Sequence, residues 1–528
     1  KLSLMSNRSD VETILTPTSP IIRRAPLWSL KSIRLRVVIL LALALTVEGL
    51  MRSNLNMAYV CMVHEDREAT PRESVHHGDD CPLLTFRSNM TEGPRQQVGE
   101  LLHWKSTDRA YLFPMFYIGG LFVCFGTEYI DRRIGASATI LYGAIINVVC
   151  TLATPWIAIA MGPIALAAVR FIMGAGQGVL HPGMNVLVSR WFPVVEKSTA
   201  LAIATTGNQL SVIFAMGVTA ELCQVESLGG WPAAFYIYGI LGVGLCIIWW
   251  AVVVDHPEDS KNISDDERHL LCDEVAKNGG KKKMKPRWSV LLKSPVVWAI
   301  CCSSFCHNFI VVGFSSYLPF YYKTVHNMTL TTNGLLCTLP FVIQFFSKVV
   351  FAGFADASKK RKWMSITAVT KICNSAASFG IALSLIVMSF CDCSSRLAAV
   401  VAASTAMAFI SAYVPGYNTS VVCVAPTQTA AISSLSRLFA QVGMSLSPTL
   451  IGVVVATGHV EEWRIIFFGM AALCVSSGIF FQLCGSASVQ SWNEVRESKP
   501  DGAKLLVDPS LNSVDKNNHI EMESDETK

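Results

Sequence analysis

Long apolar runs separated by short polar turns dominate the sequence. Each run reaches about the 20 residues that a helix needs to cross the hydrocarbon core of a bilayer. The pattern therefore predicts an all-α membrane protein with twelve transmembrane helices. We place these helices at about residues 37–63, 110–130, 136–157, 161–188, 198–220, 232–254, 295–320, 331–353, 363–388, 395–418, 428–456 and 463–484.

Polar stretches divide the chain into two halves of six helices each. The predicted parts are an N-terminal tail, a first six-helix bundle interrupted by a long hydrophilic loop, a basic central loop, a second six-helix bundle and a C-terminal tail. In that order they are residues 1–36, 37–254 with its loop at 64–109, 255–294, 295–484 and 485–528.

Composition supports a protein embedded in a lipid bilayer. Only 15% of the 528 residues are charged and the mean hydropathy is +0.43, whereas soluble domains carry about 25% charged residues. The net charge of +5 does not indicate nucleic-acid binding, because the basic residues fall between the apolar runs. Most of the 17 cysteines lie inside apolar runs and are expected to act as small hydrophobes.

No catalytic or cofactor-binding pattern stands out in the sequence. A histidine-rich cluster, a metal pair, a Ser-His-Asp arrangement, a nucleotide motif and a CxxC pair with zinc spacing are all missing. We therefore expect a protein that is not an enzyme and that uses no cofactor and no metal.

The distribution of basic residues predicts the orientation in the membrane. Lysine and arginine gather on one side if twelve spans alternate, and the positive-inside rule makes that side the cytosol, together with both termini. The sequons at Asn89 and Asn327 then fall on the opposite side, where glycosylation is expected. The basic positions are the N-terminal tail, Arg132, Arg133, Arg190, Lys197, residues 255–294 and residues 359–362.

Two similar cytosolic turns suggest an internal repeat. GTEYIDRRIGA at residues 126–136 and GFADASKKRKW at residues 353–363 each place a glycine, an aspartate and basic residues after the second helix of a half. A duplicated six-helix unit is typical of transporters whose substrate site lies between the halves near the membrane midplane. We expect the aspartates, Asp131 and Asp356, to belong to a cytosolic gate.

Arg170 follows the apolar run MGPIALAAV. An arginine at the centre of a span costs roughly 2.5 to 3.5 kcal/mol on insertion scales, so such a residue usually faces a bundle interior and serves a function. The alternative is a side chain that snorkels from near the helix end. Gly174 and Gly178 form a GxxxG pair that lets a neighbouring helix approach closely, and a bend is expected near Pro182.

These turns and the Arg170 helix resemble the major facilitator superfamily. Three stretches are similar to its anion-transporter family, which includes sialin, the vesicular glutamate transporters and the type I sodium–phosphate co-transporters. The resemblance implies a secondary transporter that moves carboxylates such as sialate or glutamate, or phosphate, by alternating access. The stretches are LMRSNLNMAYV at 50–60, GQGVLHPGMNVLVSRWFPVVEKS at 176–198 and GYNTSVVCVAPTQ at 416–428.

The resemblance also suggests site residues. Arg52 matches a first-span arginine that contributes to anion recognition in the family, and Asn54 follows it as in the family pattern. Arg170 matches the fourth-span arginine. Gln177 stands where family members usually carry a proton-coupling glutamate, and His307 stands where glutamate transporters place an arginine and sialin a tyrosine.

The chemistry of these side chains leaves several roles open. Arg52 offers a fork of donors for a carboxylate or phosphate, but Glu48, one helical turn earlier, either neutralises it or acts as a switch that substrate or a proton releases. His307 is either a pH-dependent charge or a hydrogen bonder between helices. Tyr117 is a candidate wall of the cavity or a packing residue, and Lys348 is expected to snorkel near a span end.

The driving force and the compartment are also left open. Because Gln177 does not titrate, coupling to protons through Glu48 or His307, coupling to sodium, and a facilitative carrier are all considered, as is a transporter-like receptor without flux. The sequence DGAKLL at residues 501–506 resembles an acidic dileucine sorting signal. It favours an endolysosomal or vesicular membrane, with the plasma membrane as the alternative.

Overall fold

The structure is a computed structural model that describes residues 32–65, 101–105, 107–124, 126–192, 196–260, 263–264, 267 and 287–493. Several predictions made from the sequence concern residues outside these ranges. They concern the sequon at Asn89, most of the loop at 64–109, the basic part of the central loop, both tails and the dileucine-like segment at 501–506.

The described chain is almost entirely helical, as the apolar runs predict. The first half consists of α1 (Ile33–Met62), α2 (Asp108–Cys124), α3 (Thr127–Ile134), α4 (Ala136–Ala160), α5 (Gly162–Gly178), α6 (Leu180–Trp191), α7 (Lys197–Leu222) and α8 (Pro232–Val252). The second half consists of α10 (Trp288–Leu291), α11 (Pro295–Thr324), α12 (Leu330–Lys360), α13 (Ile366–Ser389), α14 (Arg396–Ile410), α15 (Tyr417–Cys423), α16 (Thr429–Val454) and α17 (Val460–Cys484). A short parallel ribbon pairs β1 (Val63–Glu65) with β2 (Leu102–Trp104).

Ten helical stretches of the described chain are long and apolar enough to cross a membrane by length and composition. Some of these stretches join consecutive elements, such as α5 with α6. The remaining two predicted spans correspond to α1 and to α2 with α3, and α2 alone has only 17 residues. The prediction of an all-α membrane protein built from twelve helices therefore agrees with the structure.

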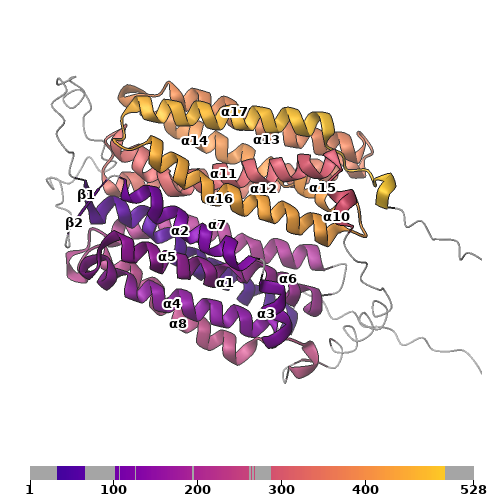
Figure 1. The fold of residues 1–528 in the computed structure, drawn as a ribbon, viewed down its shortest axis with the longest axis horizontal. Coiled ribbons are helices and arrows are strands. Elements are labelled where there is room, and N and C mark those ends of the chain that lie inside the picture. Colours follow the sequence, from indigo (N-terminus) through magenta and orange to yellow (C-terminus); the bar gives the residue numbers. More distant parts are fainter. Residues whose placement is uncertain are drawn as a thin grey trace, which may run out of the picture.

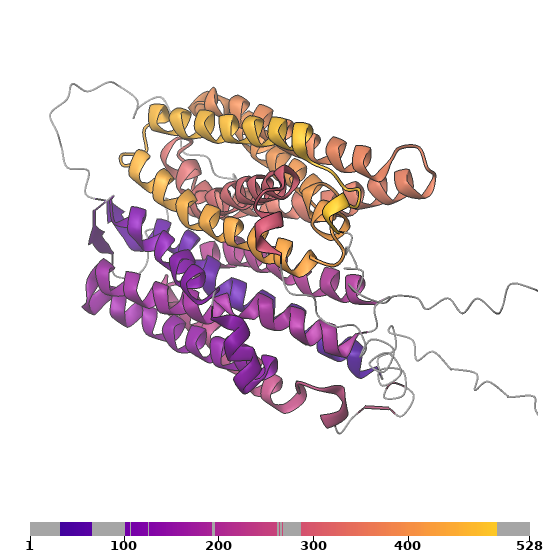
Figure 2. The same ribbon diagram turned by 45° about the vertical axis from the view of Figure 1, so that its right-hand side comes forward.

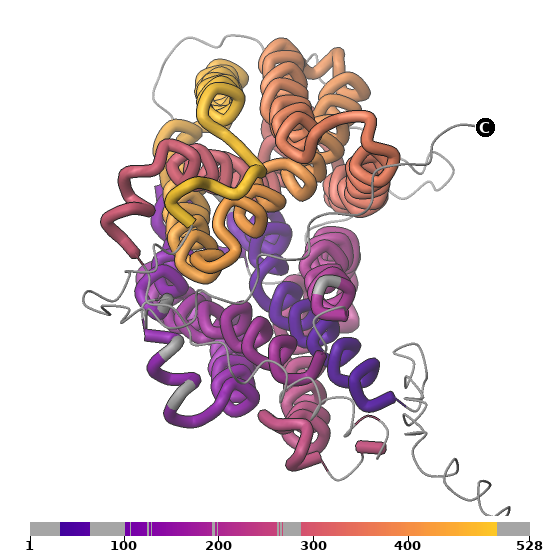
Figure 3. The backbone as a smooth tube through the Cα atoms, turned by 90° about the vertical axis from the view of Figure 1, so that its right-hand side faces the viewer, coloured from indigo at the N-terminus to yellow at the C-terminus, as the bar shows by residue number. Residues whose placement is uncertain are grey.

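The helices form two bundles that lie side by side (Figure 1). The first half, α1–α8, makes up the N-bundle and the second half, α11–α17, makes up the C-bundle; Figure 2 and Figure 3 show the same separation from other directions. Equivalent helices pack in equivalent ways, since α1 packs on α7 as α11 packs on α16, and α2 packs on α5 as α12 packs on α14. This correspondence supports the internal repeat inferred from the sequence.

The two ends of the molecule differ, and each is given a name here. The termini end is where α1 begins at Ile33 and α17 ends at Cys484, and the ribbon end is the opposite one, which carries β1 and β2 (Figure 1). Three pairs of helices join the bundles: α2 with α16, α7 with α12 and, less extensively, α1 with α11.

Small residues allow the helices of the N-bundle to cross at close range. A Cβ atom added to Gly174 on α5 would overlap the carbonyl oxygen of Phe116 on α2, and one added to Gly119 on α2 would overlap the carbonyl oxygen of Phe171. Only glycine permits this contact between backbones. The close approach expected from the GxxxG pair is therefore confirmed.

Three predicted spans are divided rather than continuous. The second span breaks at Gly126 between α2 and α3, and the fourth breaks at Val179 between α5 and α6. The tenth breaks between α14 and α15, where Gly416 leaves the helical conformation. The fourth-span break lies three residues before Pro182, close to the bend expected there. Pro182 falls in the first turn of α6, where the missing backbone N–H breaks no helical hydrogen bond.

A buried charge cluster fixes the start of α1 at the termini end. The fully buried guanidinium of Arg34 contacts Glu267 of the central loop at 3.1 Å and Glu196 at 2.5 Å. Glu267 also accepts hydrogen bonds from the Ser32 hydroxyl at 2.5 Å and from the Ile33 backbone amide at 3.2 Å. A carboxylate at this position satisfies open N–H groups at the helix start and complements its dipole.

Disulfides occur at the ribbon end. Cys61 near the end of α1 is bonded to Cys223, which directly follows α7, and Cys393, in the turn between α13 and α14, is also disulfide-bonded. The expectation that most cysteines act as small hydrophobes did not anticipate these bonds, because the partners are 162 residues apart for the Cys61 bond. The α1–α7 pair is therefore held by a covalent link as well as by packing.

We expect Cys223→Ser to lower the free energy of unfolding by about 2 to 4 kcal/mol, because the open chain gains conformational freedom when unfolded. The measurement is SDS-induced unfolding of the purified protein in mixed micelles. Cys484→Ser, at a free cysteine in the last turn of α17, is the matched control. Equal stability of the two variants, or no response of the wild type to reductant, would contradict the assignment.

Candidate functional site

Arg52 and Glu48 lie one turn apart on α1 in the middle of the N-bundle. The Glu48 side chain is 2% exposed and neither carboxylate oxygen has a hydrogen-bond partner among the described residues. Arg52 is half-buried and interacts electrostatically with Glu48. The two side chains make no hydrogen bond to each other within the described chain, and both roles considered for Glu48, neutralisation of Arg52 and a switch, stay predictions.

Arg170 holds the backbone of Arg52 in place. Its guanidinium donates a hydrogen bond to the backbone carbonyl of Arg52 at 3.1 Å and lies 4.9 Å from the ring centroid of Phe116. The residue is only 3% exposed. Arg170 therefore does not snorkel to a surface; it positions α1 against α5 and holds the backbone that carries Arg52.

The other candidates of the N-bundle are also buried near this point. Tyr117 packs its ring edge-to-face on Phe116 at 5.3 Å, and its backbone carbonyl accepts a hydrogen bond from Gln441 of the C-bundle at 2.9 Å. Asn54 is fully buried, and both atoms of its amide group lack a partner within the described chain. The side-chain oxygen of Gln177 is buried and unpaired in the same sense.

His307, the candidate from the C-bundle, joins two helices. Its Nδ1 lies 3.0 Å from the Tyr417 hydroxyl on α15, and its ring stacks on Tyr413 with centroids 5.2 Å apart. This geometry matches the role of a hydrogen bonder between helices, one of the two roles considered for it.

The C-bundle also contributes two cations toward its middle. Lys348 on α12 is half-buried and interacts electrostatically with His307, so it does not sit at a span end as expected from the sequence. Arg437 on α16 interacts electrostatically with His181 of the N-bundle. Sequence reasoning missed Arg437, although a basic residue within the small and apolar run SSLSRLFAQVGMS was the available signal.

The two candidate gate aspartates occupy unlike environments at the termini end. Asp131 on α3 is 8% exposed. The Asp356 side chain at the end of α12 is 81% exposed and lies 3.9 Å from Lys359. Similar sequences therefore do not place the two carboxylates in equivalent settings.

Polar and aromatic contacts close the ribbon end between the bundles. Lys323 of α11 donates a hydrogen bond to the Val60 carbonyl at 2.7 Å, and Gln224 donates one to the Thr331 hydroxyl at 2.8 Å. The rings of Phe113 and Tyr317 meet edge-to-face at 5.5 Å. The path between the bundles is therefore blocked on the side of the ribbon.

Arg109 reinforces this closure from the N-bundle. The guanidinium carbon lies 3.4 Å from the ring centroid of Phe320 on α11 and 5.8 Å from that of Tyr59 on α1. The residue is 1% exposed. A cation buried against aromatic faces is attracted to them more strongly than one at an exposed site.

His326 also lies at the ribbon end, in the turn between α11 and α12. Burial, aided by the nearby Arg396, lowers its pKa to about 4 against the opposing effect of Asp392. The imidazole therefore stays neutral above about pH 5, and His326 does not act as a charge switch in that range. Asn327, the sequon residue beside it, is exposed.

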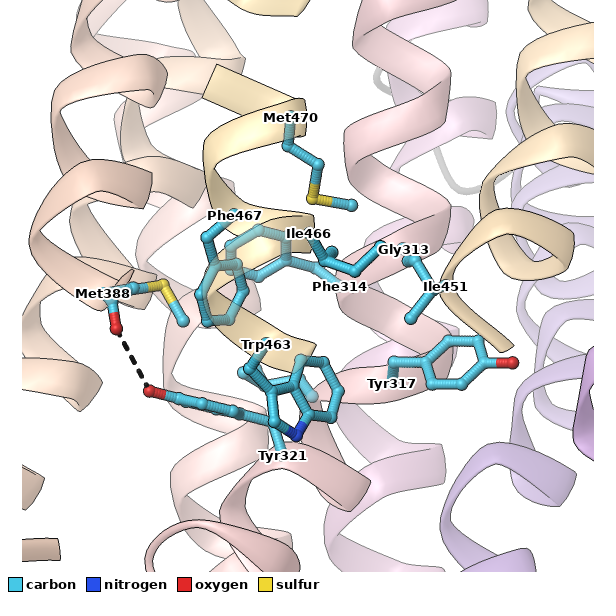
Figure 4. A pocket seen from close by; sticks show the side chains of 11 residues that line it. Gly313, Phe314, Tyr317, Tyr321, Met388, Ile451, Trp463, Ile466, Phe467 and Met470 are labelled. Atoms are coloured by element: carbon cyan, nitrogen blue, oxygen red, sulfur yellow. Dashed lines mark hydrogen bonds between the residues drawn. The ribbon is translucent and has the colours of Figure 1, made fainter. Parts of the chain in front are cut away.

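One apolar pocket lies inside the C-bundle rather than between the bundles. Its lining comes from α11, α13, α16 and α17, and the Tyr321 hydroxyl donates a hydrogen bond to the Met388 carbonyl at 3.5 Å (Figure 4). No lining residue is charged, so the pocket does not suit an anion. The residues drawn are Gly313, Phe314, Tyr317, Leu318, Tyr321, Met388, Ile451, Trp463, Ile466, Phe467 and Met470.

Comparison with known proteins agrees with this architecture. The sequence pattern of the Major Facilitator Superfamily matches residues 41–379. The chain belongs to the Major Facilitator Superfamily. It is therefore a membrane transporter and not an enzyme.

Relatives within this superfamily include two proteins with informative names. The chain is 27% identical to human sialin, over 91% of this chain and 94% of sialin. It is 26% identical to the sodium-dependent phosphate transport protein 3 of Mus musculus, over 84% of this chain and 92% of that protein. The fold resembles the inward-open conformation of the xylose transporter XylE from E. coli with a TM-score of 0.60, at 10% identity over 85% of this chain and 95% of XylE.

We expect Arg109→Ala to loosen the ribbon end, because the cation–π contacts that it removes contribute about 0.5 to 2 kcal/mol. Hydrogen–deuterium exchange should rise in peptides covering residues 55–62 and 317–324. Arg133→Ala is the control, since Arg133 makes a similar contact with Tyr129 at 5.3 Å, but at the termini end. Unchanged exchange at both peptides would show that Arg109 does not hold the bundles together.

Proposed function

We propose that the protein carries small organic or inorganic anions across a membrane by alternating access, with Arg52 as the main contact of the N-bundle to the substrate. One observation carries this proposal: Arg52 is only half-buried in the bundle interior while Arg170 holds its backbone. A guanidinium positioned in this way offers a fork of donors to a carboxylate or phosphate. Relatives named sialin and sodium-dependent phosphate transport protein 3 support the same substrate class.

The balance of charge in the middle of the described spans also favours an anion. Four cations lie there: Arg52, Arg170, Lys348 and Arg437. Within the described helices, Glu48 is the one acidic residue at a comparable depth. An excess of positive charge in a low-dielectric interior favours the binding of an anion, which offsets it.

We propose that the termini end faces the cytosol. Both halves carry their basic turns at that end, as the positive-inside rule requires. The disulfide-bonded residues Cys61, Cys223 and Cys393 lie at the opposite end, and disulfides persist in oxidising compartments. Glycosylation of Asn327 at the ribbon end, and of Asn89, follows from the same orientation. The membrane in question is endolysosomal or vesicular, with the plasma membrane as the alternative.

With this orientation the structure corresponds to a state that is closed toward the lumen or exterior. Substrate bound at Arg52 would leave toward the cytosol, and rocking of the two bundles would open the ribbon end in the other half of the cycle. Asp131 and Asp356 are proposed to act at the cytosolic end of the path.

The driving force depends on which group titrates during the cycle. Gln177 does not titrate, which favours coupling through Glu48, coupling to sodium, or a facilitative carrier. Glu48 is proposed as the switch, because its unpaired carboxylate lies close to Arg52 and competes with the substrate for it.

The first experiment measures uptake of labelled phosphate, sialate, glutamate and urate into proteoliposomes, at two pH values and with or without sodium. We expect saturable uptake of at least one anion, and its loss in Arg52→Ala. Arg52→Lys should retain only part of the activity, because an ammonium lacks the bidentate fork. Arg361→Ala, at an exposed turn of the termini end, is the matched control. Ligand binding without any flux would instead favour a transporter-like receptor.

A second experiment tests the role of Glu48. Glu48→Gln keeps the shape of the side chain but removes its charge and its ability to take up a proton. We expect uptake to become independent of pH and the apparent affinity for the anion to rise, since the competing carboxylate is gone. Unchanged pH dependence in this variant would exclude Glu48 as the switch. Glu461→Gln, at the exposed start of α17, is the control.

A further inference from the structure

A surface pocket lies at the termini end of the C-bundle, where α10, the start of α11 and the residues after α17 come together (Figure 1). Its volume of about 400 Å³ falls within the range of about 300 to 1,000 Å³ that is typical of small-molecule sites. None of its lining residues is acidic. The polar and aromatic side chains of the lining are Ser289, Lys293, Ser294, Gln490 and Trp492.

Hydrogen bonds to one turn hold both sides of this pocket. The turn, residues 424–428, connects α15 to α16. On one side the Arg287 backbone amide, directly before α10, donates to the side-chain oxygen of Gln428 at 3.3 Å. On the other side the Gln490 backbone amide donates to the Val424 carbonyl at 2.9 Å. Segments about 200 residues apart in the sequence are thus fixed next to each other.

The groups inside the pocket suit a phosphate. Ser294 directly precedes the 30 residues of α11 and is 6% exposed, and its hydroxyl has no hydrogen-bond partner among the described residues. The first N–H groups of a helix have no partner within it, and the helix dipole favours an anion there. Lys293 adds an exposed ammonium group next to these donors. A hydroxyl, open backbone N–H groups and an ammonium together form a donor set for phosphate oxygens.

The surroundings indicate that the phosphate belongs to a lipid. Trp288 and Leu292 are each 46% exposed beside the pocket, and Trp298, in the first turn of α11, is 36% exposed. Tryptophan is enriched at the level of the lipid headgroups. The sequence KKKMKPR at residues 281–287 precedes α10 directly, and five of its seven residues are basic. Such clusters next to a membrane span are attracted to the anionic lipids of the cytosolic leaflet.

We propose that this pocket binds the headgroup of a phosphoinositide, with a phosphomonoester group held by Lys293 and the start of α11. The pocket is larger than a phosphate, so it also accommodates the inositol ring, whose hydroxyls meet Ser289 and Gln490. The inference goes beyond anion transport and uses only the proposed orientation, because these lipids lie in the cytosolic leaflet. A bound lipid attaches the start of α11 and the segment after α17 to the membrane surface.

The test measures lipid binding to the purified full-length protein in phosphatidylcholine nanodiscs. The probe is a fluorescent phosphatidylinositol bisphosphate with short acyl chains, and the reference is phosphatidylserine with the same chains. We expect the wild type to bind the phosphoinositide about 10- to 100-fold more tightly, because its phosphomonoester groups make hydrogen bonds with charged partners that phosphatidylserine does not make.

Two variants address the pocket itself. Lys293→Gln removes its one positive side chain and should abolish most of the preference for the phosphoinositide. Gln490→Glu keeps the shape of the side chain but places a carboxylate in the pocket, and should weaken phosphoinositide binding at least as much. Both should leave binding of phosphatidylserine close to that of the wild type. Lys360→Gln is the matched control, because it removes the same charge from an exposed position at the same end of the molecule.

Two results overturn the proposal. One is a wild type that binds phosphatidylserine as tightly as the phosphoinositide, since attraction to the basic run alone then explains binding. The other is a preference that persists in both Lys293→Gln and Gln490→Glu. Thermal unfolding of the variants separates loss of the site from misfolding, and neither side chain is fully buried.

A free headgroup distinguishes a lipid from a soluble phosphate as the natural ligand. We expect inositol trisphosphate to bind at least about 10-fold more weakly than the lipid, because it buries no acyl chain. Equal affinities would overturn the assignment to a lipid. Nanodiscs expose both ends of the protein, so the binding results depend neither on the orientation nor on anion uptake. Failure of the lipid site is therefore distinguishable from failure of the proposed function.

Discussion

The arrangement of the interior depends on how a buried guanidinium is satisfied. Arg170 has no carboxylate at hydrogen-bonding distance within the described chain; its one short hydrogen bond goes to the backbone carbonyl of Arg52. This bond requires α1 and α5 to lie close together, and the contact between Gly174 and Phe116 brings the aromatic ring beneath the guanidinium. Arg170 is stabilised by the backbone carbonyl of Arg52 and by the ring of Phe116. This contact does not use the guanidinium of Arg52. Arg170, whose burial costs free energy, thus positions Arg52, whose guanidinium is available to a ligand.

The bundles are tied together unevenly along their length. Aromatic rings, the Lys323 hydrogen bond and Arg109 seal the ribbon end, and Gln441 joins α16 to α2 at mid-depth. Most of these contacts place side chains against backbone carbonyls or ring faces. Separating such contacts costs little free energy, because water replaces a carbonyl partner readily. The closed ribbon end can therefore open during transport.

Sequence patterns were sufficient for the architecture but not for the interior of the site. Hydropathy located the spans because each must be apolar over a bilayer thickness, and the spacing of Gly174 and Gly178 predicted a close helix crossing. The break at Val179 lies close to the bend expected at Pro182, whereas no local pattern predicted the break at Gly126. The partner of His307 is Tyr417, 110 residues further along the chain, and Arg437 meets the N-bundle only after folding. These long-range pairings are the parts that the sequence alone did not reveal.

The bond between Cys61 and Cys223 has a mechanical consequence. It joins the ribbon ends of α1 and α7, and these two helices face different partners across the bundle boundary, α11 and α12. The contact between α1 and α11 therefore cannot open while the contact between α7 and α12 stays closed without straining the disulfide. The disulfide couples the α1–α11 and α7–α12 contacts, so that both separate together when the ribbon end opens.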